Sequence, residues 1–108
     1  MPILEGVNKK YFHISTPSWR LLADFIFDRC DDLIRDDERQ GWHESYGKMI
    51  GAETAIAIAN RLERLIQEGV VERYEIELSI VNMQSHFNEK ILKRFIEFCG
   101  DSGGFDIW

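Results

Sequence analysis

The sequence predicts a mainly α fold of three to four helices packed around a central alanine-rich helix, with a short two-stranded β element pairing the N- and C-terminal segments. Three observations predict it. Apolar residues recur at helical spacing in three long stretches, capping and stop residues bound these stretches, and clear strand-like runs lie near the two ends. The 108 residues fit a single globular domain, 1–108, with one core.

The first helix is expected from about Pro17 to Ile34. The preceding run, Tyr11 to Ser15, is strand-like. Thr16 is expected to be the N-cap, because Pro17 then occupies the first helical position, where proline is favoured. The apolar stripe of this helix consists of Trp19, Leu22, Ala23, Ile26, Cys30, Leu33 and Ile34.

A polar segment with two glycines, residues 35–48, follows and is predicted to be a long loop, since it shows no sustained period. The second helix is expected from about Gly51 to Glu68, with Gly69 as its C-terminal stop. Its apolar sector is wide, which is typical of a helix buried by several neighbours. It is therefore the predicted central helix.

The segment from Val71 to Met83 fits both a strand and a helix. Asn88 is the expected N-cap of the last helix, which is predicted to end at Gly100. The final residues, Phe105 to Trp108, form an expected strand that pairs with the Tyr11–Ser15 run and joins the two ends of the chain.

The net charge of −6 disfavours nucleic acid and anionic membranes as partners and permits a basic protein partner. The sequence has no apolar run long enough for a membrane span and no signal peptide pattern, which favours the cytoplasm. In that compartment Cys30 and Cys99 are expected as reduced thiols packed in the core.

The clearest charged feature is an acidic stripe on the first helix and just after it. Such a stripe can steer a basic partner, and it can also be a solvated helix face. The candidate partner-binding residues are Asp24, Asp28, Asp31, Asp32, Asp36 and Asp37.

The loop offers a second candidate site, formed by Trp42, His43, Glu44 and Tyr46. An aromatic pair beside a titratable pair can line a ligand pocket, and the same residues can equally pack the loop onto the core. The cysteines and histidines lack the spacing of a zinc site, and no nucleophile elbow or phosphate-binding loop is present. The sequence therefore predicts no metal, no cofactor and no catalytic residues.

The C-terminal run has a distinctive pattern, F-x-x-F-x-x-x-x-G-G-F-x-I, carried by Phe95, Phe98, Gly103, Gly104, Phe105 and Ile107. It resembles the ending of a group of small bacterial proteins. Looser agreement covers Phe12-His13, Trp19, Leu22, Gly47, the alanine-rich helix ending at Leu62 to Gly69, and Tyr74 with Leu78. The resemblance implies a helix over the segment containing Tyr74 and Leu78. It implies no activity, because none is established for that group.

Two hypotheses of function follow, and a third is structural. The first is an acidic protein–protein interaction module, of the kind that an immunity protein or antitoxin represents, which covers a basic partner. The second is a small-ligand binder or enzyme that uses the 41–48 loop. The third is a homodimer, because three short helices could leave part of the second helix uncovered. The absence of a catalytic motif favours a protein that is not an enzyme.

Overall fold

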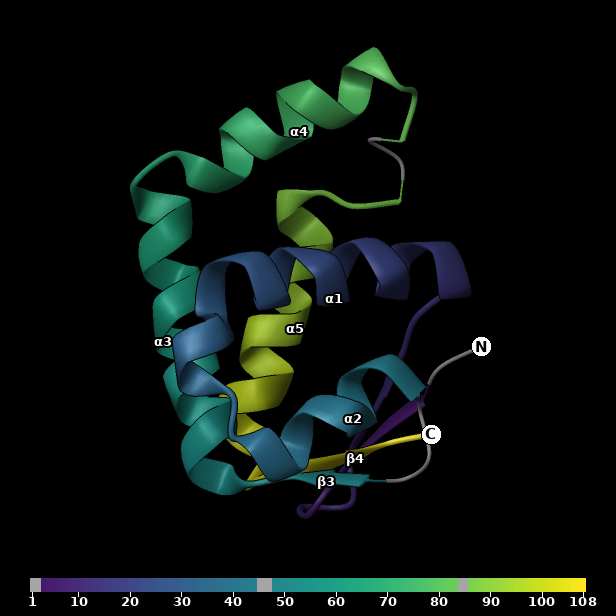
Figure 1. The fold of residues 1–108 in the computed structure, drawn as a ribbon, viewed down its shortest axis with the longest axis vertical. Helices are drawn as coiled ribbons and strands as arrows, with labels where there is room; N and C mark the ends of the chain where they lie inside the picture. The colour runs from purple at the N-terminus through teal and green to yellow at the C-terminus, as the bar shows by residue number, and fades with distance from the viewer. Residues whose placement is uncertain (1–2, 45–47, 84–85) are drawn as a thin grey trace.

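The computed structural model describes residues 3–44, 48–83 and 86–108 of the chain (Figure 1). Within these ranges the chain forms five α-helices, one short 3-10 helix and four β-strands. They are β1 (Ile3–Gly6), β2 (Tyr11–His13), α1 (Thr16–Cys30), η1 (Asp31–Leu33), α2 (Asp36–Glu44), β3 (Lys48–Ile50), α3 (Ala52–Gln67), α4 (Val70–Ile80), α5 (Glu89–Ser102) and β4 (Phe105–Ile107). The predicted mainly α class is confirmed.

The strands form one antiparallel sheet in the order β2-β1-β4-β3. The N- and C-terminal segments pair as predicted, but the partner strand is different. Strand β4 pairs with β1, with Leu4 opposite Ile107, and β2 pairs with the other edge of β1. Strands β1 and β3 were not predicted, because Ile3–Gly6 shows no sustained alternation and Lys48–Ile50 lies at the end of a polar segment.

The hairpin between β1 and β2 is fastened to the C-terminal end of α5. The backbone N–H groups of Val7 and Asn8 donate to the carbonyl oxygens of Gly104 and Ser102, at 2.9 and 3.1 Å. The Asn8 side-chain amide donates to the Asp101 carbonyl at 3.0 Å. The Ser102 and Asp101 carbonyl groups belong to the last turn of α5, so the Asn8 donors satisfy groups that would otherwise have no partner within the helix.

Helix α1 begins one residue earlier than predicted and ends four residues earlier. Ser15 is the N-cap, and its hydroxyl accepts a hydrogen bond from the Ser18 N–H at 3.3 Å. The predicted cap, Thr16, is already helical. At the other end the chain tightens into η1, and Ile34 is extended, with φ −91° and ψ 124°.

The predicted loop over residues 35–48 is wrong, because most of it forms α2 and its last described residue begins β3. Glu38, only 4% exposed, explains how this polar segment is held as a helix. Its Oε1 accepts from the Arg35 N–H at 3.0 Å and from the Thr54 hydroxyl at 2.8 Å, and its Oε2 accepts from the Gly51 N–H at 2.7 Å. One carboxylate therefore caps the starts of both α2 and α3.

Helix α3 is buried by several neighbours, as predicted for the central helix. It packs most extensively along α5 and also contacts α1, η1 and α4. Its buried residues are Thr54, Ala55, Ile58, Ala59, Leu62 and Leu65. Ile56, which the sequence placed on the apolar face, is 48% exposed. Gly69, with φ +78°, ends this helix region as expected, and the segment after it is helical rather than a strand.

Helix α5 starts after Asn88, whose side chain accepts from the Ile91 N–H at 3.0 Å, as predicted. It runs past the predicted stop at Gly100 and ends at Ser102. The true stop is the pair Gly103 and Gly104, whose φ angles of +72° and +103° suit glycine.

Aromatic side chains from both ends of the chain fill the core beneath the sheet. Trp19 and Trp42 stack in parallel, with ring centroids 5.7 Å apart. The Trp42 ring also meets the edges of Phe95 and Phe105. Its indole Nε1 is buried without a hydrogen-bond partner in the described part of the chain. Trp42 thus anchors α2 by packing.

We expect Glu38→Ala to lower the free energy of unfolding by about 3 kcal/mol, because it leaves buried donors of two helices without an acceptor. Glu63→Ala removes an exposed carboxylate from α3 and should change stability by less than about 0.5 kcal/mol. Urea denaturation of both variants measures the difference. Equal stability of the two variants would contradict the capping role of Glu38.

Gly104→Ala should destabilise the protein, whereas Gly100→Ala should not. A Cβ at Gly104 would lie 2.8 Å from the Ile50 carbonyl oxygen, while a Cβ at Gly100 would meet nothing within 4 Å. Alanine is favoured over glycine inside a helix, so Gly100→Ala should stabilise by up to about 1 kcal/mol. Thermal melts of the two variants should shift in opposite directions.

Candidate functional site

All six aspartates predicted to bind a partner are exposed, and the structure divides them into two groups. Asp31, Asp32, Asp36 and Asp37 lie on η1 and the start of α2. Asp24 and Asp28 lie on α1, close to α4. The acidic stripe expected from the sequence is therefore split between two parts of the surface, which have different neighbours.

The first group is largely neutralised by arginines of the same chain. Arg39 contacts both Asp31 and Asp36, the latter at 3.3 Å. Both terminal nitrogens of Arg61 bind the carboxylate of Asp32 at 2.9 Å. The hydrogen bonds from Arg61 lower the pKa of Asp32. These carboxylates already have cationic partners, so they offer little charge to another protein.

The second group borders the half-buried ring of Tyr74 on α4. Burial raises the pKa of the Tyr74 hydroxyl, and the nearby carboxylates of Asp24, Glu77 and Asp28 raise it further. Asp28 pairs with Arg29 at 2.6 Å. Asp24 has no ion pair within the described ranges. Helices α1 and α4 thus share an acidic border that sequence spacing did not reveal.

Helix α4 carries an exposed apolar ridge on the side opposite the core. Val71 and Leu78 face inward and are buried. Ile76 and Ile80 lie on successive turns of the outer side and are 59% and 78% exposed. Val81 follows directly and is 60% exposed. Single exposed apolar residues are common, but neighbouring ones form a patch that marks interaction surfaces.

A hollow of about 390 Å³ lies between α1 and α4, next to the acidic border. Its lining residues are Arg29, Val70, Arg73, Tyr74 and Glu77. We call Asp24, Asp28, Tyr74, Glu77 and the ridge residues Ile76, Ile80 and Val81 the α1–α4 face.

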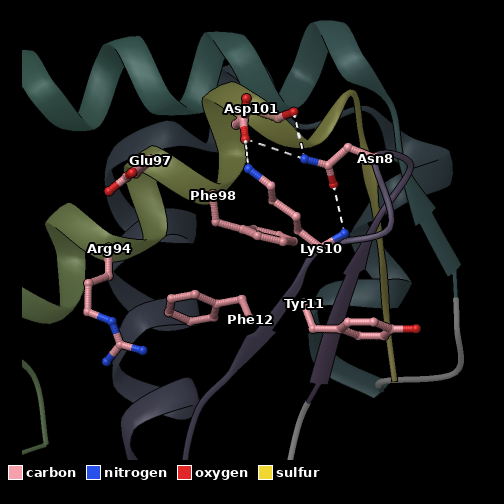
Figure 2. A pocket seen from close by; sticks show the side chains of 8 residues that line it. All are labelled: Asn8, Lys10, Tyr11, Phe12, Arg94, Glu97, Phe98 and Asp101. Atoms are coloured by element: carbon pink, nitrogen blue, oxygen red, sulfur yellow. Dashed lines mark hydrogen bonds and ion pairs between the residues drawn. The ribbon is translucent and has the colours of Figure 1, made fainter.

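A second hollow, of about 240 Å³, lies between the β1–β2 hairpin and α5 (Figure 2). The hairpin contributes Asn8, Lys10, Tyr11 and Phe12 to its walls. Helix α5 contributes Arg94, Glu97, Phe98 and Asp101. We call it the β2–α5 groove. The ammonium group of Lys10 binds Asp101 at 2.9 Å, which raises the pKa of Lys10.

The predicted ligand cluster in the 41–48 segment is described only in part. Trp42 lies in the aromatic core and is fully buried, so its ring is a packing residue. His43 and Glu44 belong to the end of α2, but their side chains lie outside the described part of the structure, as does all of Tyr46. A ligand site formed by these three residues stays a prediction.

The residues that the structure describes contain no group of three metal-ligating side chains. His13 is exposed on β2 and His86 is half-buried before α5, while the His43 side chain lies outside the described part. Among the helices of the described ranges, none has both the length and the apolar character that crossing a membrane requires.

Both cysteines are buried free thiols, as the sequence predicted. Burial raises the pKa of Cys30 to about 11, from an ordinary value of 9.0. Burial also raises the pKa of Cys99, and the proximity of Cys30 adds to this. Because the thiolate is the reactive form, both groups should be inert in the folded protein.

We expect both thiols to react with iodoacetamide at pH 8 at least about tenfold more slowly in the folded protein than in guanidinium chloride. Mass spectrometry counts the labels. The raised pKa of Cys30 also contributes stability below pH 9, and this contribution should decline as the pH rises from 9 to about 11. Rapid labelling of either thiol in the native protein would contradict the buried environment.

No protein-family model, curated protein or solved structure matches this chain. The resemblance of the C-terminal run to small bacterial proteins therefore stays a prediction.

Proposed function

We propose that this chain is a protein–protein interaction module that binds a basic partner on its α1–α4 face. The exposed ridge of Ile76, Ile80 and Val81 on α4 carries the proposal, because it leaves apolar surface in water beside carboxylates. A partner that covers the ridge gains burial of this apolar surface, and its basic groups can meet Asp24 and Glu77.

Charge supports a basic partner rather than an acidic one. The exposed acids on and beside α4 include Asp24, Asp28, Glu72 and Glu77. They outnumber the two exposed cations there, Arg73 and Arg29, and Arg29 is bound to Asp28. The chain as a whole carries a charge of −6. Electrostatic steering would therefore bring a basic protein to this surface faster than a neutral one. An immunity or antitoxin-like role, in which the chain covers a basic toxin, is the specific form of the proposal.

A homodimer is the alternative occupant of the ridge. The sequence suggested that the central helix could be incompletely covered; Ala55, Ile58 and Leu62 are fully buried, whereas Ile56 is 48% exposed. A second copy would bring the same acids to the same place, and like charges facing each other disfavour association. The ligand-binding alternative rests on residues of the 41–48 segment that the structure describes only in part.

The test begins by cross-linking the tagged protein to its partner in extract of the source organism, with the partner identified by mass spectrometry. The purified partner is then titrated calorimetrically against Ile76→Glu/Ile80→Glu and against Ile56→Glu. Ile56 is 48% exposed on α3 and is the matched control. We expect the double variant to weaken binding by at least about tenfold and the control to leave it unchanged.

A charge pair of variants tests the second half of the proposal. Asp24→Asn/Glu77→Gln should weaken the binding and reduce its dependence on salt, whereas Asp36→Asn/Asp37→Asn should not. Equal affinity for all four variants would reject the α1–α4 face. Light scattering at two concentrations tests whether the chain forms a homodimer through the ridge. A mass that doubles in the wild type but not in Ile76→Glu/Ile80→Glu would assign the ridge to a second copy.

A further inference from the structure

Strand β2 is an edge of the sheet, and its hydrogen-bonding pattern leaves an open backbone row. On β1, Ile3 exchanges hydrogen bonds with Trp108, and directly after it the Val7 N–H donates to Gly104, so the odd-numbered residues bond toward β4. The even-numbered Gly6 bonds toward β2, where its N–H donates to the Lys10 carbonyl at 2.8 Å. By the alternation of an antiparallel pair, Phe12 bonds to β1.

The backbone N–H and C=O groups of Tyr11 and His13 therefore point away from β1, toward the free edge. The described part of the chain supplies no strand on that side. The β2–α5 groove runs along this edge, because Lys10, Tyr11 and Phe12 are consecutive and all line it. Successive side chains of a strand point to opposite faces of the sheet. A hollow that contacts three consecutive residues therefore follows the strand edge, which all three share.

The groove has an apolar floor and one cation without a carboxylate partner. Phe12 and Phe98 form the floor, with ring centroids 5.7 Å apart. The Arg94 guanidinium lies 5.6 Å from the centre of the Phe12 ring. Within the described ranges Arg94 has no ion pair, whereas Lys10 is held by Asp101. Glu97 also lines the groove, but the Arg94 side chain extends away from its carboxylate (Figure 2). Figure 2 shows Arg94 beside Phe12, on the α5 side of the groove.

We propose that the β2–α5 groove binds an extended peptide segment of a partner protein, which adds a strand to β2 and places an acidic side chain on Arg94. The free groups of Tyr11 and His13 supply the main-chain hydrogen bonds of strand addition. An apolar side chain of the peptide packs on Phe12 and Phe98. The carboxylate pairs with the guanidinium, which suits a planar two-oxygen group.

This groove is separate from the α1–α4 face. It lies at the sheet end of the molecule, whereas α4 lies at the opposite end of the long axis (Figure 1). A peptide can therefore bind in the groove whether or not a basic partner occupies the α1–α4 face. The two partners also differ in chemistry, since one is basic and the other presents an acidic extended segment.

A phage-displayed library of random dodecapeptides tests the proposal. We expect selection on the wild-type protein to enrich peptides that combine an acidic residue with β-branched residues. Fluorescence anisotropy then compares the enriched peptides on Arg94→Glu, Lys93→Glu and His13→Pro. Lys93 is the matched control, because it is the adjacent cation of α5 but lines a different hollow. His13→Pro removes one outward N–H, a change that edge strands tolerate.

Arg94→Glu and His13→Pro should each weaken binding by at least about tenfold, and Lys93→Glu should change it by less than about twofold. The proposal requires that both variants lose affinity for the peptide. It is overturned if no peptide is enriched, or if either variant still binds the peptide as the wild type does. If His13→Pro fails to fold, hydrogen exchange on the wild type takes its place. The amides of Tyr11 and His13 must then become protected when the peptide binds.

Discussion

The buried carboxylate of Glu38 is the constraint on which the arrangement of this fold depends. It binds the start of its own helix through the Arg35 N–H and the start of α3 through Gly51 and Thr54. A buried charge is costly unless hydrogen bonds compensate it, and here three donors do so. The contact fixes the position of α2 relative to α3. It thereby also fixes the position of Trp42 in the aromatic core. A polar segment thereby becomes part of the framework.

Local sequence signals predicted those parts of the fold that depend on local chemistry. Three such features depend on residues close in sequence and were predicted correctly: the cap at Asn88, the stop at Gly69 and the buried stripe of α3. Helix α2 was missed because its stability comes from contacts with residues distant in sequence: Glu38 binds Thr54, and Trp42 packs against Phe105. Strand β3 was missed for the same reason, since its partner, β4, is remote in sequence.

The candidate sites were harder to predict, because a surface depends on which elements become neighbours. The acidic stripe was correctly seen as exposed, but its neutralisation by Arg39 and Arg61 requires η1 to lie beside α2 and α3. The ridge of Ile76 and Ile80 could have been found from helical spacing, once the segment was taken as a helix. The β2–α5 groove had no local signal, since its walls come from opposite ends of the chain.

The pairing of β1 with β4 has a consequence for synthesis of the chain. Synthesis runs from the N- to the C-terminus, so Leu4 leaves the ribosome long before its partner Ile107. Strand β1 can form its hairpin with β2 early, but its second edge stays open until residues 105–107 are available. Such an edge is a template for pairing with other chains. Nascent chains interrupted before Phe105 would therefore be prone to aggregate and to need chaperones.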